Sequence, residues 1–202
     1  MSSNLIITCI LVALVAAVVV AWYLGKSVRF SKGNYGKKTV KSVLRRYAAT
    51  HNFKLLENVE MELDGSSQTI DFVLVGFFGL IFVSALQGKG DFYGDFKEEK
   101  WTFVDEEQRI RFNNPVIEMD KKLEMFRCII AQKKVYNLKV DTAIVVVSTK
   151  TDVPMYLSNV RENNPVMNVE QFRKMLGNEK YERDNNVDVD TVCKVLRELK
   201  GN

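Results

Sequence analysis

The feature that most constrains this chain is an uninterrupted apolar run near its amino terminus. Residues 5–24, LIITCILVALVAAVVVAWYL, contain no charged side chain. A helix of that length rises about 30 Å, which matches the hydrocarbon core of a bilayer. The preceding MSSN has no basic side chain, and the run is longer than the apolar core of a cleaved signal peptide. The sequence therefore predicts a transmembrane helix over residues 5–24, behind a tail of residues 1–4.

Basic side chains after the apolar run predict its orientation. Residues 25–35 form a basic linker that contains Lys26, Arg29 and Lys32, and more Lys and Arg follow in residues 37–46. Because positive residues beside a transmembrane end stay in the cytoplasm, we expect a single-pass protein of the cell membrane whose carboxyl-terminal domain is cytoplasmic. We also expect the three basic linker residues to contact anionic lipid headgroups.

The remaining composition narrows the chemistry. Cys9, Cys128 and Cys193 are far apart and odd in number, which indicates neither a disulfide framework nor a zinc site. The only histidine, His51, argues against histidine-based metal catalysis and is expected as a polar residue near a helix end. The net charge of +4 is modest, and most of the excess lies beside the apolar run. Nucleic acid therefore stays open as a partner with little support, and no protein partner is indicated.

Hydrophobic periodicity predicts the order of helices and strands. A helix is expected from Gly36 to about Thr50, and another from about Glu118 to Val135. Strands are expected in NVEMELDG, QTIDFVLVG, GLIFVSALQ and DTAIVVVS, with a hairpin in KWTFVDEEQRIRFNN. Two short helices close the chain, over about 169–176 and 190–199. This order predicts an α/β domain with a mixed central sheet flanked by helices.

One acid interrupts this apolar pattern. Asp71 lies in a strand that otherwise consists of Ile, Phe, Val and Leu. A buried carboxylate costs several kcal/mol unless it is paired or binds a metal. The alternative is an edge position, where Asp71 reaches solvent or caps a turn. The residues alone leave both interpretations open.

Residues 36–148 resemble the nuclease-related domain (NERD) family. The resemblance rests on features in a fixed order: Gly36, Ile70-Asp71, Gly79, Lys89-Gly90, Phe92-Tyr93-Gly94, Trp101 and Asn114-Pro115. It implies a fold similar to that of the PD-(D/E)xK nucleases over residues 36–150. We expect residues 151–202 to be a helical extension packed on this domain.

The resemblance also implies what the site has lost. In these nucleases an Asp on one strand and a Glu-x-Lys on the next hold Mg²⁺ and assist the attacking water. The Glu-x-Lys falls on Ser84-Ala85-Leu86, and the glutamate of the first helix falls on Lys37. Glu118 falls near a family glutamine after Asn-Pro. Asp71 alone is retained, as the one candidate metal ligand.

Two functions follow from the resemblance. The first is a membrane-anchored, catalytically inactive NERD-like protein without a cofactor, acting as a cytoplasmic binding or scaffold module. The second is a Mg²⁺-dependent nuclease with migrated ligands, for which Lys89, Asp91, Glu57 and Glu118 are candidates.

The two interpretations of Asp71 lead to different geometries. We expect Asp71, Ser84 and Leu86 on neighbouring strands and on one face of the sheet. We further expect the Lys37 ammonium to approach Asp71 in place of a metal and to form a closed polar cluster, with Lys38 as the substitute if the helix is rotated. In the alternative, both lysines point to lipid headgroups and Asp71 meets water or backbone N–H groups.

Overall fold

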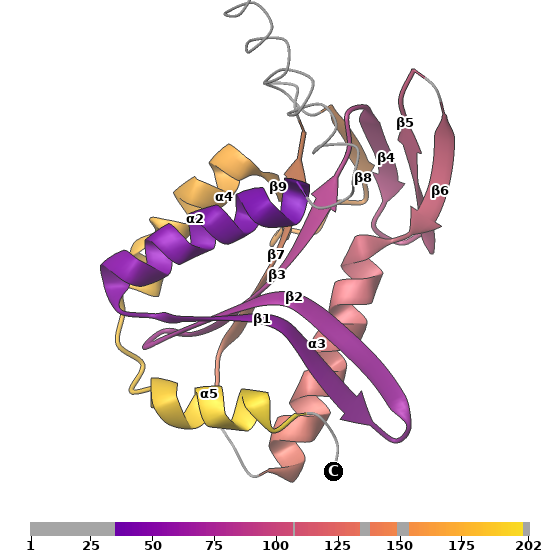
Figure 1. Cartoon of the computed structure of the whole chain (residues 1–202). Helices are drawn as coiled ribbons and strands as arrows, with labels where there is room; N and C mark the ends of the chain where they lie inside the picture. Colours follow the sequence, from indigo (N-terminus) through magenta and orange to yellow (C-terminus); the bar gives the residue numbers. More distant parts are fainter. Residues whose placement is uncertain (1–34, 107, 134–137, 149–153, 200–202) are drawn as a thin grey trace, which may run out of the picture. The chain divides into compact units, whose positions relative to one another are not determined.

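The computed structural model describes residues 35–106, 108–133, 138–148 and 154–199 (Figure 1). The predicted transmembrane helix over residues 5–24 and the linker up to residue 34 lie outside these ranges. Within them, no helix combines the length and the apolar character that crossing a membrane requires.

A five-stranded mixed sheet forms the centre of the fold, in the order β1-β2-β3-β7-β9. Its strands are β1 (Lys54–Leu63), β2 (Ser66–Gly76), β3 (Gly79–Gln87), β7 (Val140–Val147) and β9 (Val166–Asn168). β1, β2 and β3 form an antiparallel meander, whereas β7 runs parallel to both β3 and β9. This arrangement confirms the predicted mixed α/β sheet.

A second, four-stranded sheet has the order β6-β5-β4-β8. Its strands are β4 (Asp91–Asp95), β5 (Lys100–Val104), β6 (Arg109–Asn113) and β8 (Met155–Ser158). The β5–β6 hairpin was predicted, whereas β4 was not among the expected strands. The segment after residue 150 also differs from the expected helical extension, because it supplies β8 to this sheet and β9 to the central one.

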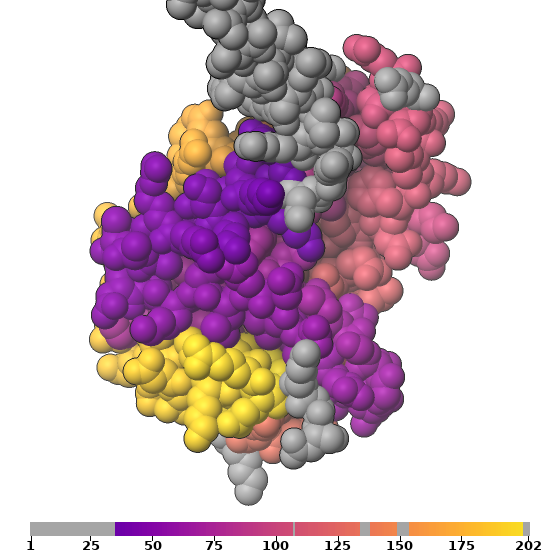
Figure 2. Space-filling model, viewed as in Figure 1, coloured from indigo at the N-terminus to yellow at the C-terminus, as the bar shows by residue number. Residues whose placement is uncertain are grey.

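In the described ranges, four α-helices flank the central sheet: α2 (Tyr35–His51), α3 (Pro115–Gln132), α4 (Val169–Leu176) and α5 (Val189–Arg197). Side chains of α3 and α5 share one hydrophobic core with the sheet residues Phe82 and Ile144. α4 contacts β7 and β9, and Figure 1 shows α2 and α4 together on the side of the sheet away from α5. In Figure 2 the indigo of α2, the purple of β1 and β2 and the yellow of α5 form one continuous surface.

Close packing explains two of the glycines on which the family resemblance rests. Gly79, at the predicted β2–β3 turn, has φ +126, and a Cβ atom there would lie 2.3 Å from the carbonyl oxygen of Lys139. A Cβ atom at Gly94 would lie 2.4 Å from the ring of Trp101, which is 1% exposed. Neither position accepts a larger residue without displacing its neighbours.

Candidate functional site

Asp71 lies at the point where β2 and β3 separate. Their antiparallel ladder runs from the pair Gly76–Gly79 to the pair Phe72–Val83. Just beyond this last pair, the backbone N–H of Ala85 donates to Oδ2 of Asp71 at 3.1 Å. The carboxylate therefore satisfies an amide group that the neighbouring strand no longer reaches.

The strand alternation slips at this same place. The residues of β2 in the hydrophobic core are Ile70, Val73 and Val75, so the spacing of two fails across Asp71. On β1 the opposite residue, Asn58, has a positive φ of 49. This irregularity turns Asp71 out of the core and explains how an acid fits in an apolar strand, with 18% of its side chain exposed.

Lys37 supplies the charge that compensates Asp71. Its Nζ lies 2.6 Å from Oδ1 of Asp71. The start of α2 is held by a hydrogen bond from the Gly36 N–H to Oε1 of Gln87, at 2.7 Å. A Cβ atom at Gly36 would lie 3.0 Å from Cβ of Gln87, so glycine lets the helix approach the end of β3. The predicted approach of Lys37 to Asp71 is confirmed, but the Lys37 side chain is 44% exposed and the expected closed cluster is not formed.

Two further ion pairs lie along the same side of α2 as Lys37. Lys41 Nζ lies 2.6 Å from Oε2 of Glu57, and Arg45 Nη2 lies 3.1 Å from Oε1 of the same residue. Lys37, Lys41 and Arg45 are four residues apart, so they line one side of the helix. These pairs were not predicted from the sequence, although the spacing of four was a signal for them. Glu57, once a candidate metal ligand, is thus held by two cations.

Ser84 and Leu86 lie on β3, the neighbour of β2, as predicted. Leu86 packs against the hydrophobic core, in step with Leu80 and Phe82. Ser84 falls on that same side by strand alternation. The Asp71 carboxylate accepts from the Ala85 N–H and pairs with Lys37 on α2, and no contact in the described part of the chain joins it to the Ser84 or Leu86 side chain.

The remaining candidates lie elsewhere in the fold. Glu118 is in the first turn of α3 and pairs with Lys121 at 3.4 Å. Asp91 begins β4 in the second sheet, Lys89 precedes that strand, and Lys38 is exposed on α2. Among the residues that the structure describes, no three His, Cys, Asp or Glu side chains are grouped to hold a metal ion.

The fold and this site define a mixed α/β domain with an ion pair where two central strands part. The family model for the nuclease-related domain, NERD, matches residues 32–147, and the chain belongs to this family. No curated protein and no solved structure gave a significant match. The matched range ends with β7, so β8, β9, α4 and α5 lie beyond it.

Proposed function

We propose that the protein is a membrane-anchored NERD-family protein without nuclease activity, whose domain serves as a cytoplasmic binding or scaffold module. The observation that carries this proposal is the contact of 2.6 Å between the Lys37 ammonium and the Asp71 carboxylate. The family resemblance assigns a metal ion to this carboxylate, and here the ammonium group of Lys37 compensates its charge. Binding experiments with this domain would identify its protein partner.

The residues present fit Mg²⁺ poorly. Mg²⁺ prefers several oxygen ligands in near-octahedral order, and carboxylates are the usual protein donors. Asp71 is paired with a cation, while Ser84 offers an uncharged hydroxyl and Leu86 offers no donor. A divalent ion at Asp71 would also be repelled by the ammonium group of Lys37.

A gain-of-binding variant tests the loss of the metal site. The full-length chain in detergent is titrated with Mg²⁺ or Mn²⁺ by calorimetry and assayed for cleavage of single- and double-stranded DNA. We expect no specific metal binding and no cleavage above background for the natural chain. The variant Lys37→Glu sets a second carboxylate beside Asp71 and should bind the metal measurably. Metal-dependent cleavage by the natural chain that is lost on Asp71→Ala would overturn the proposal.

The nuclease with migrated ligands makes a different prediction for the same assay. Glu57 and Glu118 both have cationic partners in the structure, and Glu57 has two. If they served as ligands, cleavage would depend on Glu57 or Glu118 and would survive Leu86→Ala. No contact in the described part of the chain favours this second function over the first.

Membrane anchoring and orientation can be tested with a native cysteine. Cys128 is exposed on α3, whereas Cys193 is buried in α5. A membrane-impermeant thiol reagent should label Cys128 only after intact cells are permeabilised. Cys128→Ser is the matched control for the specificity of the signal. Labelling of Cys128 in intact cells would contradict the cytoplasmic orientation.

A further inference from the structure

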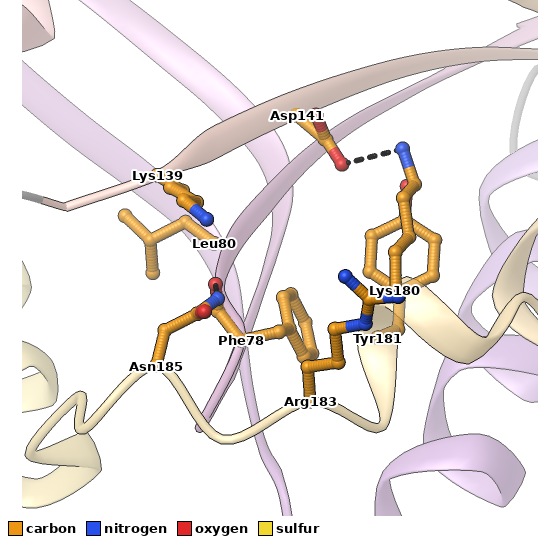
Figure 3. Close-up of a pocket in the computed structure, with 8 residues that line it drawn as sticks. All are labelled: Phe78, Leu80, Lys139, Asp141, Lys180, Tyr181, Arg183 and Asn185. Atoms are coloured by element: carbon orange, nitrogen blue, oxygen red, sulfur yellow. Dashed lines mark hydrogen bonds and ion pairs between the residues drawn. The ribbon is translucent and has the colours of Figure 1, made fainter.

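A pocket lies at the other end of β3 from Asp71. It has a volume of about 220 Å³ and opens beside the β2–β3 turn and the beginning of β7 (Figure 3). Leu80, at the start of β3, lines it, and Ala85, the backbone partner of Asp71, is five positions further along β3. At about 3.3 Å per residue the two places are roughly 17 Å apart, so the pocket is a separate site.

The side chains that line the pocket carry a net positive charge. Lys139, Lys180 and Arg183 line it together with a single acid, Asp141. Asp141 pairs with Lys180 at 2.9 Å. Within the described ranges, Lys139 and Arg183 make no ion pair, and Figure 3 shows both side chains at the pocket. Two cations in one concave site raise the local potential and attract an anion.

The cationic side of the pocket is held in place by packing. The Lys180 ammonium lies 4.7 Å from the ring centroid of Tyr181, a cation–π distance. Tyr181 is 2% exposed and meets Phe78 edge to face, with the ring centroids 5.0 Å apart. Lys180 is therefore fixed by a buried ring as well as by Asp141.

The loop that carries Arg183 is tied to the β2–β3 turn. The backbone N–H of Asn185 donates to the carbonyl of Phe77 at 2.9 Å, and its side-chain amide donates to the carbonyl of Phe78 at 2.8 Å. Residues from three distant parts of the sequence are thus brought to one place. Such preorganisation is typical of a binding site, because little ordering remains to be done when the ligand arrives.

We propose that this pocket binds the phosphate group of a small phosphomonoester with an apolar or aromatic body. Arg183 offers the planar donor pair that matches phosphate oxygens, and Lys139 and Lys180 add charge. Phe78 and Leu80 form an apolar wall for the rest of the ligand. The small volume of about 220 Å³ fits a small molecule better than an extended polyanion, and the proposal is independent of the Asp71 site.

Calorimetry with phenyl phosphate and inorganic phosphate, on the full-length chain in detergent at constant ionic strength, tests the proposal. Phenyl phosphate should bind more tightly than inorganic phosphate because it also contacts the apolar wall. Arg183→Gln and Lys139→Gln should each weaken its binding by roughly tenfold, the usual loss for one charge-assisted contact. Lys174→Gln, on an exposed lysine of α4, should leave the binding unchanged.

Asp141→Asn gives a variant with the opposite expected sign. It releases Lys180 from its pair and removes the one negative charge, so phenyl phosphate should bind several-fold more tightly. A gain of affinity cannot result from misfolding. Weaker binding by Asp141→Asn, an equal loss with Lys174→Gln, or no heat with phenyl phosphate at millimolar concentration would overturn the proposal. Binding to anionic vesicles or to oligonucleotides, but not to phenyl phosphate, would also overturn it and identify a macromolecular phosphate source.

Discussion

At the scale of single residues, the proposed loss of nuclease chemistry depends on the pair of Lys37 and Asp71. A metal ion offers several coordination positions to substrate and water, whereas an ammonium group offers only hydrogen bonds. The pair with Asp71 still compensates the carboxylate, and Asp71 still accepts the Ala85 N–H. The aspartate therefore keeps a structural role that does not depend on catalysis.

A double-mutant cycle on Lys37→Met and Asp71→Asn should give a coupling energy of about 1 kcal/mol in urea unfolding. The value is modest because nearly half of the lysine side chain is exposed. The matched cycle with Lys38→Met should give no coupling, since Lys38 is exposed on the same helix and has no ion pair with Asp71. Equal coupling for both lysines would show that only the general positive charge of α2 matters.

A second prediction at this scale concerns the buried hydroxyl of Tyr181. Its hydroxyl is buried and makes no hydrogen bond of full geometry to the residues that the structure describes, although the Asp141 carboxylate is close enough to act on it. Burial raises the pKa of Tyr181, with the charge of Asp141 adding to the effect, so the hydroxyl stays protonated. Tyr181→Phe should stabilise the protein by about 1 kcal/mol, because a buried unsatisfied polar group is removed while the ring is kept. Urea unfolding measures this change, and a clear loss of stability would reveal a partner for the hydroxyl.

At the scale of elements, Asn114 joins a helix to a loop. Its side-chain oxygen accepts the Val116 N–H and caps α3. Its side-chain nitrogen donates to the carbonyls of Asp95, Phe96 and Glu98, at 3.0, 3.3 and 2.7 Å. Since an amide nitrogen has two hydrogens, at least one of them is shared. The Asn-Pro landmark is therefore explained by structure and not by catalysis.

Two substitutions separate the roles of Asn114. Asn114→Ala should cost about 2–4 kcal/mol of unfolding free energy, because the cap and the buried loop contacts are both lost. Asn114→Asp keeps an equally good cap but faces three carbonyl oxygens with a carboxylate. A similar loss in Asn114→Asp would show that the loop contacts dominate, whereas a nearly unchanged stability would contradict their importance. Chemical unfolding of both variants at neutral pH decides this.

Asp188 predicts a pH dependence at the start of α5. The Thr191 hydroxyl donates to it at 2.6 Å, and this bond, aided by the Thr191 and Asp190 N–H groups, lowers the pKa of Asp188. A lowered folded-state pKa means that the stabilisation is complete above about pH 4, the unfolded value, and is lost as the pH falls through the folded value.

The thermal midpoint of the natural chain should therefore fall more steeply between pH 5 and pH 3 than that of Asp188→Asn. The asparagine keeps the cap without the titrating group. Circular dichroism melts measure this difference. Asp190→Asn is the control, because the Asp190 side chain makes no hydrogen bond within the described residues. Identical slopes for the natural chain and Asp188→Asn would contradict the prediction.

Sequence patterns revealed some elements of this fold and not others, for physical reasons. The helix from Gly36 and the β5–β6 hairpin show a full hydrophobic repeat, so they were predicted. β4, β8 and β9 have only five, four and three residues. β8 and β9 are strands because distant chain segments pair with them, and β4 pairs with the nearby β5 as well as with the distant β8. The Lys37–Asp71 contact followed from the family resemblance, whereas the pocket combines stretches that no local pattern links.

At the scale of the whole molecule, the segment from residue 154 onward completes the fold although it lies beyond the NERD match. β8 and β9 extend the two sheets, and α5 supplies Val192 and Leu196 to the hydrophobic core. Deleting residues 154–202 would leave β7 as an open edge and expose the core that α5 covers. The domain should therefore lose its cooperative thermal transition.

A near-UV circular dichroism melt of the full-length and truncated chains in the same detergent tests this. Lys174→Ala, on the exposed side of α4, should melt as the natural chain does. A truncated chain that melts cooperatively at nearly the same temperature would show that residues up to 153 fold by themselves. Loss of the transition would extend the structural domain past the family boundary.

The late position of β8 and β9 also governs when the protein can fold. β4 gains its second neighbour only when β8 has been made, which follows α3 and β7. In the same way, β7 gains its second neighbour only when β9 has been made. Pairings between distant segments form slowly, since the loop between them must close first. During synthesis the unpaired edges of β4 and β7 stay open to other chains until residues 155–168 have left the ribosome. Such a nascent chain is a natural client for chaperones that shield strand edges.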